Sequence, residues 1–444
     1  MNGDLKNLEL VTVATDYNDA VKRYVQSCEK YGYKVTILGL EKKWEGGDMK
    51  NGIGGGQKVN LLKDYLKTLD ENKLIIFTDS YDVIANNNLE YFYEKYNKHY
   101  KNKIVFGTEC FCWPDPLLQN LFPDIENGIN KYLNSGNFVG YKDDLLNIMS
   151  DSIEDNEDDQ LYYTNIFLEE VKLKSFLDDK ILDICLDYPN YLFVCLNGAS
   201  NYSIDSYKSC IVMDNLSQPA FIHANGPPSI KRLLNNISNL CIREFNQIEQ
   251  QLIDMYREKS EWCIDLPVIK IIYEGKNKNL SIFENIFYPK EKLDIENISL
   301  QEAAEKADKI SKYIYDYILY INDEVIIKNK YFLLDLVLEN KSIIAPLFRE
   351  ENSLKSNFWG DLSNEGYYAR SESYIPLVNR NINGCFNVPY ITSCFLIKSS
   401  LFNKSLFLEN TDKGEGIDMA MCYNCREKNI FMWILNKDFY GYLK

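Results

Sequence analysis

Residues 74–84, Leu-Ile-Ile-Phe-Thr-Asp-Ser-Tyr-Asp-Val-Ile, decide the fold class, because two carboxylates follow an apolar run directly. The run itself predicts a buried central strand. Working outward toward the amino terminus, we expect a strand over 8–15, a helix over 18–31 that stops at Gly32, a strand over 33–38 and a helix over 57–69. This alternation predicts an α/β domain of Rossmann-like type, with a parallel sheet covered by helices on both faces.

Asp79 and Asp82 fall just beyond the carboxyl end of that central strand, where ligands bind in such sheets. Two carboxylates this close repel each other unless a cation joins them. Mg²⁺ and Mn²⁺ take one or two carboxylates and leave other positions to phosphate oxygens, whose charge they neutralise. The pair therefore predicts either a cation site for a nucleotide diphosphate or an Asx-capped turn.

The chain has only two histidines, so a two-histidine iron centre would need both of them. His99 lies in a charged helical stretch, and we expect it at the surface. His223 follows an apolar segment and precedes a Gly226-Pro227 turn. It is either a third metal ligand or a structural residue.

Two further segments carry polar chemistry. Residues 52–58, Gly-Ile-Gly-Gly-Gly-Gln-Lys, form a loop that opens a helix, so its backbone amides and Lys58 favour a phosphate. The loop fits neither the P-loop nor the dinucleotide-binding pattern. Residues 154–160 form an acidic run that is either a solvated loop or the start of a helix carrying Asp158 and Asp159.

The second half repeats the alternation, with strands expected over 268–273, 318–321 and 342–345 and helices over 300–312 and 331–338. We therefore expect two domains, residues 1–262 and 263–444. The net charge of −16 argues against a nucleic-acid partner. Cys422-x-x-Cys425 is weak evidence for zinc, and buried thiols are the alternative.

Nine collinear segments resemble the glycosyltransferase region of the multifunctional procollagen lysyl hydroxylase/glucosyltransferase family. They are residues 11–15, 44–48, 54–58, 79–84, 111–114, 133–136, 158–161, 196–199 and 223–227. Segments around 357–360, 367–372, 387–391 and 418–420 resemble the family's accessory domain. Ala224 and Asn137 depart from expected glycines, and Met49 departs from an expected valine.

The resemblance implies a GT-A-type catalytic domain followed by a degenerate, non-catalytic GT-A-like domain. Its expected activity is Mn²⁺-dependent, retaining transfer of glucose from UDP-glucose to galactosyl-hydroxylysine in collagen or a collagen-like protein. The implied metal ligands are Asp79, Asp82 and His223. The implied donor-site residues are Trp44, Met49, Lys58, Asp79, Tyr81, Gly226 and Lys231. The implied catalytic or pocket residues are Asp158, Asp159, Asn197, Glu109, Trp113 and Asn134.

Three questions stay open at this level. The transfer proceeds through a carboxylate nucleophile or by same-face attack. Two alternatives to transfer onto galactosyl-hydroxylysine stay open: direct transfer of glucose or galactose to hydroxylysine, and a non-catalytic collagen-binding module. The family's hydroxylase domain is not expected here, so a separate lysyl hydroxylase is a candidate partner.

Residues 1–6 lack the features of a secretory signal. We therefore expect a soluble protein in a cytoplasm-like compartment (the host cytoplasm for a virus), or in the endoplasmic reticulum lumen if a signal was removed.

Overall fold

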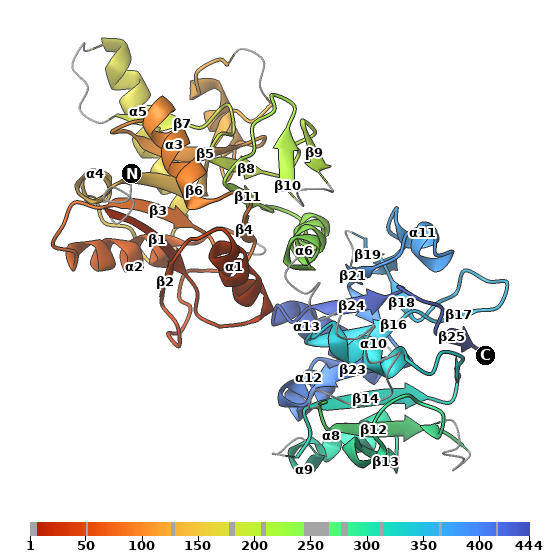
Figure 1. Ribbon diagram of the computed structural model, residues 1–444. Coiled ribbons are helices and arrows are strands. Elements are labelled where there is room, and N and C mark those ends of the chain that lie inside the picture. The colour runs from red at the N-terminus through yellow and green to blue at the C-terminus, as the bar shows by residue number, and fades with distance from the viewer. Residues whose placement is uncertain are drawn as a thin grey trace. The chain divides into compact units, whose positions relative to one another are not determined.

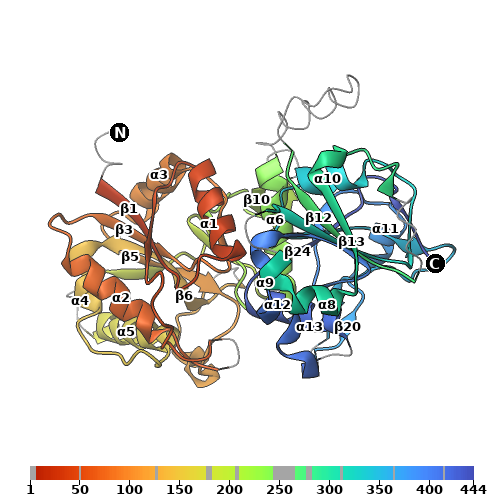
Figure 2. The ribbon, with the colours of Figure 1, turned by 90° about the horizontal axis from the view of Figure 1, so that it is seen from below.

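The chain divides into two units, residues 1–242 and 243–444. The computed structural model describes residues 7–49, 52–125, 129–176, 183–205, 210–243, 266–276, 283–310, 314–363, 366–413 and 416–444. The domain boundary predicted after residue 262 lies outside these described residues. Each unit is a sheet with helices packed on its faces (Figures 1 and 2).

The sheet of the first unit is mixed rather than wholly parallel. Its strands, in spatial order, are β2 (Val35–Leu38), β1 (Leu8–Val13), β3 (Leu74–Thr78), β6 (Tyr132–Tyr141), β5 (Ile104–Glu109) and β7 (Ile184–Leu186). The predicted parallel pairing of β1 with β2 and β3 is confirmed. Strand β6, however, runs antiparallel between β3 and β5. The apolar pattern of a strand does not encode its direction, so the sequence could not show this reversal.

Alternating side chains of the strands build two separate cores. Val11, Val13 and Phe77 face α2 (Gly56–Lys67), α4 (Lys142–Ile148) and α5 (Asp159–Phe176). Leu10 and Ile76 face α1 (Asp19–Lys30) and α3 (Leu89–His99) on the other side. Because successive side chains of a strand point to opposite faces, the same apolar runs bury both layers. The central sheet is thereby fixed between helices, which holds the carboxyl ends of its strands in place.

A second, small sheet extends the first unit beside the end of β3. It contains β4 (Val83–Ala85), β11 (Phe221–His223) and β8 (Phe193–Cys195), with β11 antiparallel to β4 and parallel to β8. Helix α6 (Pro228–Arg243) packs on it through Leu234 and Ile237. Strands β9 (Tyr202–Asp205) and β10 (Cys210–Met213) form a neighbouring hairpin, and η2 (Pro116–Leu121) is a 3₁₀ helix between β5 and β6.

The main sheet of the second unit repeats the strand order of the first and has one more strand at one edge. It is ordered β13 (Leu293–Asn297), β12 (Ile269–Glu274), β14 (Tyr317–Asn322), β23 (Cys394–Lys398), β16 (Ile343–Pro346), β24 (Met432–Leu435) and β21 (Cys385–Asn387). Strand β23 is antiparallel between β14 and β16, as β6 is between β3 and β5. The small sheet recurs as β15 (Val325–Ile327), β25 (Gly441–Leu443) and β17 (Arg349–Glu350), with the same strand directions. The expected second α/β domain is therefore present.

The helices of the second unit are mostly short. In the described part of this unit the α-helices are α8 (Leu300–Glu305), α9 (Ala307–Ile310), α10 (Phe332–Leu338), α11 (Tyr374–Val378), α12 (Lys404–Leu408) and α13 (Ile417–Glu427). The predicted helix over 300–312 is thus two helices, and its last two residues lie outside the described part of the chain. Within the described residues, no helix has the length and apolarity needed to cross a membrane.

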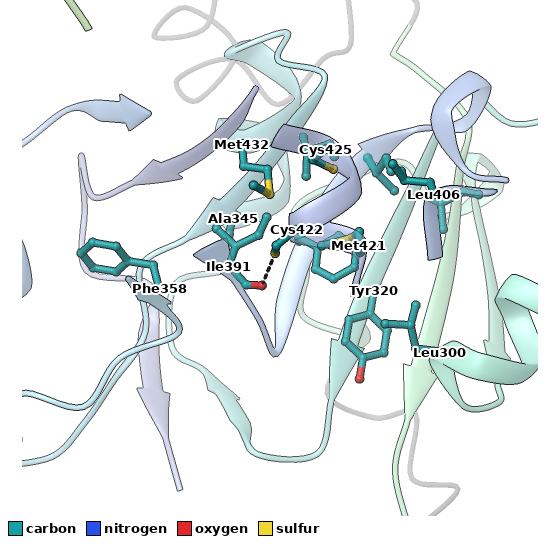
Figure 3. Packing of buried hydrophobic residues seen from close by; sticks show 14 of the residues in the cluster. Leu300, Tyr320, Ala345, Phe358, Ile391, Leu406, Met421, Cys422, Cys425 and Met432 are labelled. Atoms are coloured by element: carbon teal, nitrogen blue, oxygen red, sulfur yellow. Dashed lines mark hydrogen bonds between the residues drawn. The ribbon is translucent and has the colours of Figure 1, made fainter. Parts of the chain in front are cut away.

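Cys422 and Cys425 lie on α13 inside the core of the second unit (Figure 3). Both side chains are fully buried among apolar residues, and the Cys422 thiol donates to the carbonyl of Ile391 at 3.4 Å. Burial raises the pKa of Cys422 to about 12, which disfavours the thiolate that zinc binding requires. The pair thus lies in the apolar core, as the buried-thiol interpretation predicts, and within the described residues it is not part of a group of three or more possible metal ligands.

Candidate metal centre and its surroundings

Asp79, Asp82 and His223 come together at the carboxyl end of β3. Asp79 follows β3, Asp82 precedes β4, and His223 is the last residue of β11. The antiparallel pairing of β11 with β4 places His223 opposite Val83, and the Ala224 amide donates to the Asp82 carbonyl at 2.8 Å. One ligand atom from each of the three side chains lies within 4.8 Å of the other two. Two carboxylate oxygens and an imidazole nitrogen at this spacing suit a divalent cation such as Mn²⁺.

Each carboxylate of this triad is paired with side chains remote in sequence, rather than capping its own turn. Lys58 Nζ lies 3.0 Å from Asp79 Oδ1, and Lys231 Nζ lies 3.0 Å from Asp82 Oδ2. His223 Nε2 is 3.3 Å from Asp82 Oδ1. Burial opposes the charge on Asp82, but Lys231 and His223 outweigh it and hold the pKa of Asp82 well below its ordinary value. Burial raises the pKa of Asp79, against the attraction of Lys58. The Asx-turn alternative is not what the structure shows.

The other ring nitrogen of His223 is held by an amide of fixed orientation. Asn134 Oδ1 lies 3.0 Å from His223 Nδ1 and also accepts the Gly136 amide, while Asn134 Nδ2 donates to Glu109 Oε1. The Asn134 oxygen beside Nδ1 favours a proton on that nitrogen, and the neutral ring in this tautomer has its Nε2 lone pair for a cation. Asn137 Nδ2 lies 3.1 Å from the same nitrogen, and its buried Oδ1 has no partner in this orientation. Rotating that amide would let its oxygen accept from Nδ1 as well.

Lys58 connects the triad to the start of α5. Its ammonium lies 2.8 Å from Asp159 Oδ2 and 3.0 Å from Asp79 Oδ1, and all three side chains are at least three-quarters buried. Gly55 permits this approach, since a Cβ at that position would lie 2.3 Å from Asp159 Oδ1. The end of the acidic run, residues 158–160, is thus the buried helix start that the sequence offered as one alternative, whereas Glu154, Asn156 and Glu157 are exposed in the turn before it, as the solvated-loop alternative predicted.

The glycine loop does not present its amides to a phosphate. Gly55 donates to the carbonyl of Gly46, and Gly56 and Gln57 donate to the carbonyls of Glu157 and Asp155. For Gly55, Gly56 and Gln57 the expectation that the loop amides favour an anion is therefore wrong, because each of these three amides already has a backbone partner. Of the features expected in this loop, the Lys58 ammonium is the one directed at the triad.

The structure separates the two adjacent acids at the start of α5. Asp158 Oδ1 accepts the Leu161 amide at 2.7 Å and so occupies the N-cap position of the helix. Burial raises the pKa of Asp158. Asp159, one residue later, turns toward Lys58. Only Asp159 is thereby linked to the metal centre through a side chain.

Glu109, at the end of β5, is the centre of a buried polar network. It accepts from Asn134 and Gln160 on one oxygen and from Asn225 on the other, at 2.7–3.0 Å. Burial raises the pKa of Glu109 in spite of these bonds. Gln160 also donates to the Trp113 carbonyl at 3.2 Å. Gln160 and Asn225 belong to the quoted motifs, but their hydrogen bonds to Glu109 were not predictable from residue spacing.

The expected donor-site aromatic residues have structural partners of their own. Trp44 is half-buried and its indole donates to the Gly47 carbonyl at 2.8 Å. The Tyr81 hydroxyl accepts from the backbone amide of Thr15 at the end of β1, at 3.1 Å. The buried Arg23 on α1 donates to the Tyr81 carbonyl, and burial lowers the pKa of Arg23 to about 10. The charge pattern of α1 did not reveal this role for Arg23.

The remaining predicted residues make no hydrogen bond to the triad in the described part of the chain, and they differ in exposure. Met49 and Trp113 are about half exposed, at 46% and 51%. Gly226 adopts a φ of +92°, and a Cβ there would lie 2.5 Å from Asn197 Nδ2. Gly226 and Asn197 are therefore in contact. His99 is exposed on α3, as expected.

The equivalent positions of the second unit lack this donor set. Matching backbone bonds and strand pairs identify these positions. The Asn322 amide donates to the Ser393 carbonyl, as the Asp79 amide donates to the Gly136 carbonyl, and the Lys444 amide donates to the Glu324 carbonyl, as the Ala224 amide donates to the Asp82 carbonyl. Leu443 pairs with Val325 across the small sheet, as His223 pairs with Val83. The triad is thus replaced by Asn322, Glu324 and Leu443. One carboxylate remains, and an aliphatic side chain stands where the imidazole would be.

Comparison with known proteins agrees with this architecture. The family model described as the PLOD GT domain matches residues 4–251, and that described as the N-terminal domain of glycosyltransferase family 25 matches residues 278–444. Procollagen-lysine,2-oxoglutarate 5-dioxygenase of Drosophila melanogaster is 35% identical, over 98% of this chain and 65% of its own length. The multifunctional procollagen lysine hydroxylase and glycosyltransferase of Caenorhabditis elegans is 32% identical, over 99% and 66%. The uncharacterized protein R699 of Acanthamoeba polyphaga mimivirus is 30% identical, over 98% and 97%.

The chain thus spans about two thirds of the length of the animal relatives and nearly all of the mimivirus protein. Two glycosyltransferase models, one on each half, accord with the two α/β sheets of the structure. The expected GT-A-type fold, followed by a second domain of the same type, is confirmed.

Proposed function

Because the chain belongs to the PLOD GT domain family and is a glycosyltransferase of that collagen-modifying group, we propose that it transfers glucose from UDP-glucose to galactosyl-hydroxylysine in a collagen-like polypeptide, with Mn²⁺. The observation that carries the proposal is the convergence of Asp79, Asp82 and His223 beside Lys58. A non-catalytic role for the second unit is supported by its equivalent positions, which keep one carboxylate and no histidine. We assign catalysis to residues 1–262 and an accessory role to residues 263–444.

Asp79, Asp82 and His223 would hold the cation. Their donor atoms suit Mn²⁺, and the Asn134 oxygen beside His223 Nδ1 supports the tautomer in which Nε2 would bind the cation. A bound Mn²⁺ supplies positive charge that neutralises the diphosphate of the donor as it leaves. The protein's part is to fix the three ligands on three rigid strand ends.

Lys58 and Lys231 would bind the diphosphate. Both are paired with carboxylates of the site, Lys58 with Asp79 and Asp159 and Lys231 with Asp82. Once a cation also binds Asp79 and Asp82, these carboxylates no longer neutralise the two ammonium groups fully, and the positive charge of the site attracts the anionic donor. The uridine would contact Trp44 and Tyr81, because flat aromatic faces suit a base and a ribose. Met49 and Gly226 would line the same part of the donor site.

The sugar and the acceptor would lie between Glu109, Asn197, Trp113 and the start of α5. A retaining transfer needs either a carboxylate nucleophile or attack on the face that the leaving phosphate vacates. Asp159 is the acid better placed for the reaction centre, because it shares Lys58 with Asp79. Asp158 would act through the helix start that it caps.

The relatives support this acceptor, since several of them are named for procollagen lysine. A hydroxylysine must be made before it can be glycosylated, so a lysyl hydroxylase would supply the substrate. The negative net charge of −16 is compatible with a lysine-derived, positively charged acceptor.

The test is UDP release with Mn²⁺, for UDP-glucose and UDP-galactose, on galactosyl-hydroxylysine and plain hydroxylysine peptides. Turnover of UDP-glucose on the galactosylated peptide alone supports the proposal. Turnover on plain hydroxylysine would replace it with direct transfer. Silence on every pair, together with retained Mn²⁺-dependent binding of the peptides, would point to a collagen-binding module.

A further inference from the structure

Six large apolar side chains are exposed on two loops next to the candidate site. They are Met49 (46% exposed), Ile53 (56%), Phe111 (52%), Trp113 (51%), Leu117 (84%) and Leu121 (58%). We call these six residues the apolar rim. Single exposed apolar residues are normal, but a concentration of them beside a site marks an interaction surface.

Both loops are attached to the start of α5. The Asp159 amide donates to the Gly54 carbonyl at 3.2 Å, and Gln160 Nε2 donates to the Trp113 carbonyl at 3.2 Å. Gln160 also binds Glu109, and Asp159 binds Lys58. The backbone that carries the apolar rim is therefore connected by one or two hydrogen bonds to the groups that would surround the reacting sugar.

The 3₁₀ helix η2 is anchored to the first unit while two of its leucines stay exposed. Leu118, within η2, packs against the core cluster of the first unit. Its neighbours Leu117 and Leu121 on the same short helix stay exposed, and none of the residues of η2 is buried. Asp115 accepts the Leu117 amide at 2.9 Å and fixes the start of that helix. The exposed leucines thus sit on an anchored element.

We infer that the apolar rim docks the acceptor polypeptide, as an extended, proline-rich chain with basic side chains. This inference rests on the proposed function. An acceptor residue that enters the site between Trp113 and the start of α5 must lead its flanking chain across the rim. Collagen-type chains adopt the polyproline II conformation, and such chains bind aromatic-lined surfaces like that of Phe111 and Trp113. Glu154 and Glu157 are exposed in the turn that hydrogen-bonds to the loop carrying Ile53, and their carboxylates complement basic side chains.

The experiment compares two acceptors that offer the same sugar, free galactosyl-hydroxylysine and the same residue within a Gly- and Pro-rich peptide. Leu117→Ser is the test variant. Leu216→Ser is the matched control, because Leu216 is 83% exposed against 84% for Leu117 and lies on the β10–β11 connection. Kinetics are measured with UDP-glucose and Mn²⁺, and direct binding of a fluorescent peptide is measured without donor.

We expect Leu117→Ser to raise KM for the peptide about fivefold to tenfold, as for the loss of a partly buried leucine. KM for the free acceptor should not change, and Leu216→Ser should match the wild type on both. Equal effects on the two acceptors, or none on either, would overturn the inference. If the wild type transfers to neither acceptor, the proposed function fails. Peptide binding then decides the inference separately: weakening by Leu117→Ser alone supports it, and unchanged binding overturns it.

Discussion

Gly136→Ala tests whether the metal centre depends on close packing of its ligands. A Cβ at this position would lie 2.5 Å from His223 Cε1 and 2.7 Å from Asp79 Oδ2. Unbonded carbons rest at about 3.5–4.0 Å, so the imidazole and the carboxylate must move by about 1 Å. Metal sites tolerate ligand shifts of about 0.2 Å. The displacement therefore exceeds the tolerance several times over.

We expect Gly136→Ala to weaken Mn²⁺ binding about 10- to 100-fold, the usual cost of disturbing groups that orient metal ligands. Free Mn²⁺ in a titration, followed by electron paramagnetic resonance, measures the affinity without any turnover. Gly107→Ala on the neighbouring strand β5 is the matched control, since a Cβ there meets its neighbours at 3.4–3.5 Å, which is ordinary contact. Thermal unfolding checks that both variants fold. Wild-type affinity in folded Gly136→Ala would refute the packing argument and the assignment of these ligands.

Three further results are expected. Asp82→Ala should abolish metal-dependent turnover, and wild-type rates at saturating Mn²⁺ would contradict the site assignment. Asn134→Leu should change the ¹⁵N shifts of His223 in the Mg²⁺-loaded protein, because the acceptor for Nδ1–H is lost, whereas the signals of His99 should stay in place as an internal reference. Burial lowers the pKa of His223, but Asp82 outweighs it and raises that pKa above 6.5, and a proton competes with the cation. Mn²⁺ affinity should therefore rise as the pH is raised above the ordinary histidine pKa, and a flat profile in isothermal titration would argue against His223 as a ligand.

The local sequence predicted much of the fold because alternation and stop signals act over a few residues. Helix α1 illustrates this: Asn18 caps its start by accepting the Ala20 amide, and Gly32 follows its end with a φ of +80°. Strands β1 and β3 match their apolar runs. The antiparallel insertion of β6 was not predictable, since it depends on the path of the chain between β5 and β6 rather than on a periodic pattern.

The sequence by itself determined the pair Asp79 and Asp82 after a buried strand, the order of the motifs and hence the family. Tertiary structure decided what those residues do. Pairing of β11 with β4 places His223 beside the carboxylates. Backbone carbonyls accept the amides of Gly55, Gly56 and Gln57. At the start of α5, Asp158 caps the helix whereas Asp159 binds Lys58. The reason is physical: residue type and spacing set which groups can act, whereas direction and distance are fixed only when remote strands and helices pack together.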